Sequence, residues 1–398
     1  MRTLFLTIFF PPSVGGVQSY SYDLVSNLCR LGEEVVVVAP NGKEAAEVDA
    51  SLPCPVIRIS SRAGCREGAM AWQTFRILSR QRFDRVFCSD WKPSGLLALL
   101  ASRVVRVPYF LAAHGSELLD DYNARHPTKA IIFRQLRRFR RRVFHDAAAV
   151  FPVSRYTGDL VRELGISPTK ISVVPNGVET MRFFPQDKKT PLAERYGLGG
   201  KKVILTVARL DNYKGHDVVI RALPRVLHDV PDAVYLIVGT GPERPRLESL
   251  ASEVGVRPNV IFAGHVPTAD LCAHYHLADV FVMLSRKAPD EVEGFGLTFL
   301  EANACGKPVI GGSSGGTAEA VVDGETGLLI DPADVSTAAA MLVRLLTDGD
   351  LASRLGRQGL ARARNELSWA VQAAKIRQIM NDSSGLVHRT SQLMVTGR

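Results

Sequence analysis

Short apolar runs alternate with helical patterns in two successive series along this chain of 398 residues. Near-continuous apolar strands that alternate with helices are typical of a parallel sheet covered on both faces. The sequence therefore predicts an α/β protein with two doubly wound, Rossmann-like domains. The first series consists of 4–10, 34–40, 85–90, 108–114, 148–154 and 171–178. The second consists of 202–210, 233–241, 259–265, 280–285, 307–312 and 327–332.

A segment rich in charge, proline and glycine, residues 179–200, separates the two series and is interpreted as a linker. It sets predicted domain limits of 1–178 and 187–366. LSWAVQAAKIRQIM at 367–380 has the apolar spacing of a helix, and the polar residues 381–398 are expected to form a disordered tail. Parallel sheets bind ligands at the carboxyl ends of their strands. If the domains face each other, their two crevices share one interdomain cleft.

Composition narrows the class of protein. Hydrophobic residues make up 46% and charged residues 22% of the chain, as in soluble globular proteins. The amino-terminal run MRTLFLTIFFPP is short and stops at Pro-Pro, so a buried strand explains it better than a signal peptide. No apolar run reaches the length of about 18 residues needed to span a membrane. Cys88 and Cys305 lie among apolar or small residues, as reduced core thiols do, so we expect a cytoplasmic protein. The six cysteines lack a CxxC pair, which argues against zinc and against a disulfide framework.

Two cations follow a strand of the second domain. Arg209 lies at the end of the strand, and Lys214 lies five residues later, beyond a short polar turn. This pair suits a diphosphate, because each charged hydrogen bond to such a group contributes about 1.5–3 kcal/mol. Taken alone, the two side chains could equally be solvated loop cations. The net charge of +9 also indicates an anionic partner.

Two acids lie in the stretch EVEGFGLTFLEANACGKPVIGGSSGG, residues 291–316. Glu293 precedes a helix expected to begin near Leu297, and Glu301 lies on its second turn. Carboxylates accept hydrogen bonds from vicinal hydroxyls, although alone these two could be a helix-terminal charge and an exposed helix residue. Beside the two cations, they indicate a nucleotide-linked sugar. Unpaired amides at a helix N-terminus attract phosphate, and here they belong to Phe295, Gly296, Leu297 and Thr298. GGSSGG at 311–316 offers further amides, or is a flexible turn.

The first domain offers fewer chemical groups. Gly15 and Gly16 precede a helix, where their amides could meet an anion. His114 ends an apolar strand and is expected to face the crevice, while Glu117 could orient it or cap a helix. Neither GxGxxG nor GxxxxGK[ST] occurs, so the fingerprints of dinucleotide-binding and P-loop proteins are absent.

RQLRRFRRRVF at 134–144 carries six arginines. At 100° per residue, one side of a helix would present Arg134, Arg137, Arg138, Arg141 and Arg142, and the opposite side Ile132, Leu136, Phe139 and Val143. Such a helix, Arg134–Arg142, could dock on an anionic membrane surface, or it could pack on the sheet as a solvated helix. The segment belongs to no known nucleic-acid-binding module, so no nucleic acid is expected as a partner.

These motifs resemble those of retaining GT-B glycosyltransferases of family 4 over nearly the whole chain. The E-x7-E motif is present as Glu293 and Glu301, and the R-x4-K pair as Arg209 and Lys214. PNGVETMRFFP at the domain junction, the Gly15-Gly16 loop and the His114-Gly115 turn also match. Within the family, 291–316 is similar to the GDP-mannose-dependent phosphatidylinositol mannoside mannosyltransferases. HGSELL at 114–119 is a weaker match.

The resemblance implies a role for each candidate residue. Glu301 would hold the ribose, Glu293 the sugar near the reacting carbon, and Arg209 with Lys214 the diphosphate. His114 would contact the donor sugar, while Gly15 and Gly16 would line the donor and acceptor site. The first domain would bind the acceptor and the second the nucleotide sugar, and the helix near 367–380 would pack back on the first domain.

The resemblance also implies a reaction. A hexose would be transferred, with retention of configuration at its anomeric carbon, to a hydroxyl of a lipid-linked or cell-envelope glycan acceptor. The favoured hexose is mannose, with GDP-mannose as the donor. Cations and helix amides would stabilise the leaving group, so no metal and no cofactor beyond the nucleotide-sugar co-substrate is expected. The enzyme would be cytoplasmic or peripheral on the inner face of the cell membrane. The alternatives are a UDP-sugar-dependent hexosyltransferase, a sugar-nucleotide epimerase or phosphorylase, and a non-catalytic nucleotide-sugar binder.

Overall fold

The computed structural model describes residues 1–62, 64–119, 130–187 and 191–395, with side chains at all of these except 130–135 and 384–395. The chain divides into two compact units. Unit 1 contains Met1–Asn176 and Trp369–Arg398, and unit 2 contains Gly177–Ser368. The corresponding predicted limits were 178 and 366. The segment predicted as the linker, 179–200, belongs to unit 2 and includes the helix α7 (Pro191–Arg195).

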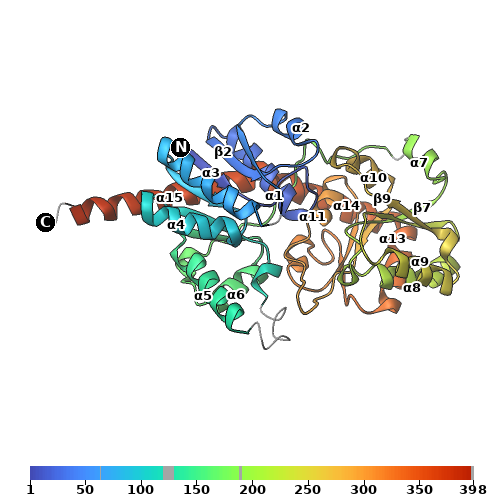
Figure 1. Ribbon diagram of the computed structural model, residues 1–398. Helices are drawn as coiled ribbons and strands as arrows, with labels where there is room; N and C mark the ends of the chain where they lie inside the picture. The colour runs from blue at the N-terminus through green and yellow to red at the C-terminus, as the bar shows by residue number, and fades with distance from the viewer. Residues whose placement is uncertain (63, 120–129, 188–190, 396–398) are drawn as a thin grey trace. The chain divides into compact units, whose positions relative to one another are not determined.

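Unit 1 is a parallel sheet of six strands in the order β3-β2-β1-β4-β5-β6 (Figure 1). The strands are β1 (Arg2–Leu6), β2 (Glu34–Pro40), β3 (Val56–Ile59), β4 (Arg85–Cys88), β5 (Tyr109–Ala113) and β6 (Ala149–Pro152). The helices are α1 (Gly16–Arg30), α2 (Ala45–Ala50), α3 (Arg66–Arg80), α4 (Leu96–Val105), α5 (Ala130–Asp146), α6 (Arg155–Glu163) and α15 (Trp369–Val395). The apolar faces of α3, α4, α5 and α6 pack on the buried strands and form a hydrophobic core with them.

Unit 2 repeats this topology in the order β12-β11-β10-β7-β8-β9, again with parallel strands. Its strands are β7 (Lys202–Val207), β8 (Ala233–Val238), β9 (Val260–Gly264), β10 (Val280–Met283), β11 (Val309–Gly312) and β12 (Leu328–Ile330). Besides α7, its helices are α8 (His216–Asp229), α9 (Arg244–Glu253), α10 (Leu271–Leu277), α11 (Leu297–Ala304), α12 (Thr317–Ala320), α13 (Val335–Thr347) and α14 (Gly349–Asn365). In both units the strand order reverses next to the first strand, which is the doubly wound arrangement. The predicted fold class is confirmed.

Two segments differ from the sequence-based expectation. The strand predicted at 171–178 is reduced to two isolated bridges, one between Ile171 and Val150 and one between Val178 and Ser368. The strand β3 was not predicted, because its four residues include an arginine that interrupts the apolar run.

The carboxyl-terminal helix α15 belongs to unit 1 and lies beside α1 (Figure 1). Trp369 is 1% exposed and packs edge-on against Tyr20 of α1, with 5.2 Å between ring centroids. The helix runs to Val395, whereas a disordered tail was expected after residue 380. Extending an existing helix gains one hydrogen bond per residue without a new nucleation cost, so polar residues can continue it.

A buried ion-pair network also holds α15. Arg85, on β4, is fully buried, and its Nη2 donates to Glu33 Oε2 at 2.5 Å. The same guanidinium donates from Nη1 to Asn381 Oδ1 at 2.8 Å, and Arg377 Nε donates to Glu33 Oε1 at 3.1 Å. Arg377 and Asn381 of α15 therefore bind the Glu33 carboxylate and the Arg85 guanidinium, which lie at the amino ends of β2 and β4.

Candidate active site

Lys214 and Glu293, 79 positions apart in the sequence, meet in unit 2. Lys214 ends the short 3-10 turn Asn212–Lys214 that follows β7, and its Nζ donates to Glu293 Oε2 at 2.7 Å. The two side chains are 14% and 13% exposed, and Ser285 Oγ donates to the same carboxylate oxygen at 3.3 Å. Burial by itself lowers the pKa of the Lys214 ammonium, but the adjacent Glu293 carboxylate outweighs it and raises the pKa above its usual value.

Glycines hold the backbone on both sides of this ion pair. Gly215 has φ 77°, and a Cβ there would lie 2.2 Å from the carbonyl oxygen of Leu284. Gly315 has φ 58°, and a Cβ there would lie 2.4 Å from the carbonyl oxygen of Glu293. The same oxygen accepts a hydrogen bond from Gly316 N at 2.8 Å. The loop 311–316 thus supports the backbone of Glu293 directly, a role that the two readings of GGSSGG did not include.

The helix α11 begins at Leu297, as predicted, and follows Gly296, whose φ is 97°. Among the described residues, no side chain caps this end, and the first turn has no acid. The amides of Phe295, Gly296, Leu297 and Thr298 therefore lie at a helix end whose dipole favours an anion.

Glu301 lies on the second turn of α11, where Tyr275 of α10 donates its hydroxyl hydrogen to Glu301 Oε2 at 2.6 Å. Burial, and then the adjacent carboxylate, raise the pKa of Tyr275, so the phenol stays protonated as a donor. The sequence offered no signal for this tyrosine, because α10 carries no recognisable motif. One oxygen of Glu301 is thereby fixed in orientation.

Arg209 is placed differently from Lys214. Its side chain is 66% exposed, and its Nε donates to Asp211 Oδ2 at 2.7 Å. His216, at the start of α8, holds the backbone instead, with Nε2 3.1 Å from the carbonyl oxygen of Arg209. Burial lowers the pKa of His216 to about 4, so this ring is neutral. Asp211 and His216 position the arginine segment, and neither was identified from the sequence.

His114 follows the carboxyl end of β5 in unit 1. Its Nε2 lies 3.0 Å from the carbonyl oxygen of Ser89, and its ring packs edge-on against Tyr20, with 4.8 Å between centroids. Burial lowers the pKa of His114, so the imidazole is neutral and donates from Nε2. Glu117 Oε1 accepts from the backbone N of His114 at 2.5 Å. Glu117 thus binds the backbone of His114 rather than its ring, and no described side chain caps the 3-10 turn Ser116–Leu118.

The loop between β1 and α1 is held by an acid that the sequence reasoning missed. Asp90, after β4, accepts from Ile8 N at 3.1 Å and from Ser94 Oγ at 2.7 Å, both through Oδ2. Burial raises the pKa of Asp90 to about 6. Gly15 lies just before α1, which begins at Gly16, and the first turn of that helix has no acid. The amides of Gly15 and Gly16, like the side chains of His114 and Asp90, follow the carboxyl ends of strands in unit 1.

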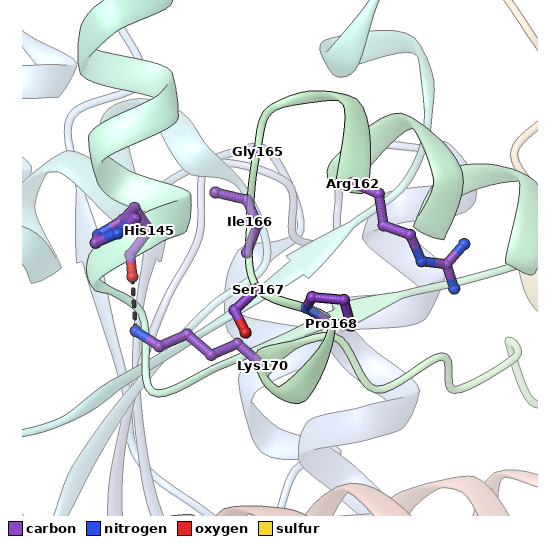
Figure 2. Close-up of a pocket in the computed structure, with 7 residues that line it drawn as sticks. All are labelled: His145, Arg162, Gly165, Ile166, Ser167, Pro168 and Lys170. Atoms are coloured by element: carbon purple, nitrogen blue, oxygen red, sulfur yellow. Dashed lines mark hydrogen bonds between the residues drawn. The ribbon is translucent and has the colours of Figure 1, made fainter.

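A hollow in unit 1 lies away from these groups, where α5 and α6 end (Figure 2). Lys170 Nζ crosses it to donate to the carbonyl oxygen of His145 at 2.7 Å (Figure 2). Because α5 ends just before β6 begins, the hollow is at the amino edge of the sheet. Its lining residues are His145, Arg162, Gly165, Ile166, Ser167, Pro168 and Lys170.

The arginine-rich helix α5 has one residue on the unexpected side. Arg137, Arg138, Arg141 and Arg142 are exposed and Val143 is buried, as predicted, but Phe139 is 55% exposed. Arg140 is buried instead and donates from Nη1 to the carbonyl oxygen of Glu117 at 3.1 Å. The side chains of Ile132 and Arg134 lie outside the described residues. The buried stripe is therefore rotated relative to the predicted one, toward Val143 and Phe144.

Two doubly wound units with polar groups after their strands define the class of protein, and solved structures agree. An Anabaena protein solved with UDP-glucose aligns with a TM-score of 0.79 at 19% identity, over 96% of this chain and 100% of that one. A sucrose-phosphate synthase from Thermosynechococcus elongatus aligns with a TM-score of 0.78 at 22% identity, over 96% and 98% of the two chains. The fold is GT-B.

Sequence comparisons identify the family. Residues 15–177 match the glycosyl transferase 4-like domain and residues 189–362 match glycosyl transferases group 1. A GDP-mannose-dependent α-(1-6)-phosphatidylinositol monomannoside mannosyltransferase from Mycolicibacterium smegmatis is 35% identical, over 95% of this chain and 98% of that protein. A monoacylated-substrate counterpart from Corynebacterium glutamicum is 31% identical, over 95% and 97%. The chain therefore belongs to the family of glycosyltransferases that these two models describe.

Proposed function

We propose that the protein transfers mannose from GDP-mannose, with retention, to a hydroxyl of a lipid-linked or cell-envelope glycan acceptor such as a phosphatidylinositol mannoside. The observation that carries the catalytic part is the Lys214–Glu293 pair, 2.7 Å apart after the carboxyl end of β7. The sugar and acceptor classes rest on the relatives whose names state them, which align along nearly their whole length.

The proposed chemistry follows from the charges at the site. The bond between mannose C1 and the β-phosphate oxygen breaks, and the acceptor oxygen bonds to C1 on the same face. The acceptor proton passes to the departing phosphate oxygen, and GDP leaves. Lys214 and the amides at the start of α11 stabilise the growing negative charge, with Arg209 contributing once it exchanges Asp211 for phosphate. Glu293 accepts from sugar hydroxyls and Glu301 from the ribose.

This arrangement uses cations and amides where other transferases use a divalent metal. An Asp-x-Asp sequence does occur at 348–350, but Asp348 Oδ1 accepts from Leu351 N at 2.9 Å and caps α14. We therefore propose that transfer needs no divalent metal.

Donor preference and the transfer reaction provide the test. We expect thermal-shift screening to give a larger stabilisation with GDP than with UDP or ADP, because bound nucleotide stabilises the folded state by mass action. Transfer from GDP-mannose to a phosphatidylinositol mannoside should proceed in EDTA and give the α-anomer by NMR. Inhibition by EDTA that Mg²⁺ or Mn²⁺ restores would contradict the proposed site.

The same assays separate the alternatives. A preference for UDP would indicate a UDP-sugar-dependent hexosyltransferase. Conversion of the nucleotide sugar without any acceptor would indicate an epimerase, and donor consumption by inorganic phosphate a phosphorylase. Tight binding without transfer to any acceptor would indicate a binding protein.

We also propose that α5 brings the enzyme to an anionic membrane surface. The exposed arginines form a cationic face, and the exposed Phe139 supplies an apolar side chain at its centre. This face continues toward the basic hollow of Figure 2, because Arg141 lies beside Gly165, which lines it. None of the described helices has both the length and the apolarity needed to cross a bilayer. Peripheral binding is the mode that such a face supports.

Vesicle sedimentation tests this membrane contact. Changing Arg138 and Arg141 to glutamate should weaken binding to phosphatidylglycerol vesicles by at least about tenfold, because each basic residue near such a surface contributes about 1 kcal/mol. A matched control changes Arg225 and Arg244, exposed arginines of unit 2, to glutamate and should bind nearly as wild type. Equal loss in both variants, or equal binding to phosphatidylcholine, would reject a specific role for α5.

A further inference from the structure

Unit 2 contains a compact cluster of metal-ligating side chains beside the candidate donor site. Cys272 and His276 lie one turn apart on α10, and Cys305 directly follows α11. One ligating atom from each lies within 4.8 Å of the other two. The side chains are buried, with Cys272 8%, His276 2% and Cys305 2% exposed. Buried polar side chains normally have a hydrogen-bond partner or a bound ion, so this cluster calls for one or the other.

The distances match a tetrahedral site. Zinc bonds thiolate at about 2.3 Å and imidazole at about 2.0–2.1 Å, so tetrahedral edges are about 3.8 Å between two sulfurs and about 3.5 Å between sulfur and nitrogen. The two sulfurs here are 3.8 Å apart, and Cys272 Sγ is 3.3 Å from His276 Nε2. A disulfide would instead need about 2.0 Å between the sulfurs.

A fourth ligand is at hand on the same side. The carbonyl oxygen of Phe184 lies 2.7 Å from His276 Nε2 and 4.0 Å from Cys272 Sγ. Without a metal, that carbonyl and the Cys272 sulfur both contact the single ring nitrogen Nε2. With a metal at the centre, each of these atoms would instead face the cation.

We propose that Cys272, His276 and Cys305, with the Phe184 carbonyl oxygen, form a structural zinc site. Two thiolates and a neutral imidazole would make the bound Zn²⁺ electrically neutral, which suits a buried position. Zinc binding would release the protons of the two thiols.

The site would stiffen the helices that carry the donor-binding residues. Tyr275 lies between the two α10 ligands, and its hydroxyl donates to Glu301, one turn before Cys305. A metal joining α10 to the end of α11 would hold this hydrogen bond in place. This zinc takes no part in bond making, so the proposal stands independently of the proposed reaction and of its metal independence.

Spacing along the sequence did not indicate such a site. Two ligands are separated by one helical turn, the third is 33 residues away from the first, and no CxxC pair is present. The spacing therefore argued against zinc, and only the packing of α10 on α11 brings the three side chains together.

Metal content and cobalt spectroscopy test the proposal. The full chain, purified without a histidine tag and dialysed against a weak chelator, should contain about one zinc per chain. Replacing zinc by Co²⁺ should give a thiolate-to-cobalt charge-transfer band and the intense visible bands of a tetrahedral ion. Cys305→Ser and His276→Ala should each lose at least about 100-fold in zinc affinity, since even outer-shell changes cost 10–100-fold.

Cys88→Ala provides the matched control, because Cys88 is a buried free cysteine of unit 1. It should retain zinc and the cobalt spectrum. Zinc removal should lower the Tm of wild type and Cys88→Ala but not of Cys305→Ser. A wild-type chain that takes up neither Zn²⁺ nor Co²⁺ after reduction, or that carries a Cys272–Cys305 disulfide when isolated, would overturn the proposal without reference to any variant.

Discussion

Lys214→Ala is expected to lower kcat of transfer by about 10²–10³-fold, the usual cost of removing one donor that stabilises developing charge. Lys214 is the most buried cation at the candidate site and already contacts Glu293 at 2.7 Å. Because its positive charge acts mainly on the departing diphosphate, kcat should fall more than KM rises. Steady-state kinetics with the donor varied at saturating acceptor measures both parameters.

The controls separate catalysis from folding. Lys201 is exposed and lies just before the amino end of β7, at the opposite edge of the sheet, so Lys201→Ala should keep near-normal kcat. Lys214→Ala also leaves Glu293 buried without its cation, which by itself destabilises a protein by about 3–5 kcal/mol. Pairing Lys214→Met with Glu293→Gln should recover most stability and still be inactive. A Lys214→Ala enzyme of near-normal kcat would remove this lysine from the mechanism.

Glu33→Ala is expected to destabilise unit 1 by about 3–5 kcal/mol, because it leaves a buried guanidinium without its carboxylate. Arg85 is 0% exposed, and Glu33 also binds Arg377 of α15, so one substitution breaks contacts on both elements. Urea unfolding, monitored by tryptophan fluorescence, measures this loss of unfolding free energy, since Trp369 of α15 is buried against Tyr20.

An exposed ion pair supplies the comparison. Arg225 is 73% exposed and pairs with Asp229 on α8, so Arg225→Ala should cost less than about 1 kcal/mol. Replacing Glu33 by Leu together with Arg85 by Met should restore part of the stability, as apolar substitution of buried pairs often does. Equal effects of Glu33→Ala and Arg225→Ala would show that the buried network contributes no more than a surface pair.

Much of the fold could be predicted because strands of a buried parallel sheet appear in the sequence as nearly continuous apolar runs. The rule that ligands bind at carboxyl strand ends then singled out His114, Arg209 and Lys214 before any side chain was placed. Where a run was short and interrupted by arginine, as in β3, the same signal failed. Composition also does not reveal that a helix started by tertiary contacts runs on through polar residues, as α15 does to Val395.

The contacts within the site were less predictable than its location. Lys214 and Glu293 were both named, but their direct pairing depends on how β7 and β10 adjoin in the sheet. His216, Tyr275 and Asp90 act by holding other groups, and single polar residues in ordinary helices or turns carry no spacing signal. Phe139 lay near the edge of a helical face, where a modest rotation decides between burial and exposure.

Because unit 1 is built from residues 1–176 and from α15, its two pieces leave the ribosome far apart in time. Synthesis at about 5–20 residues per second places an interval of about 10–40 s between them. Throughout that interval Tyr20 has no indole to pack against, and Arg85 lacks its asparagine partner. Unit 1 can therefore complete its packing only after all of unit 2 has been translated.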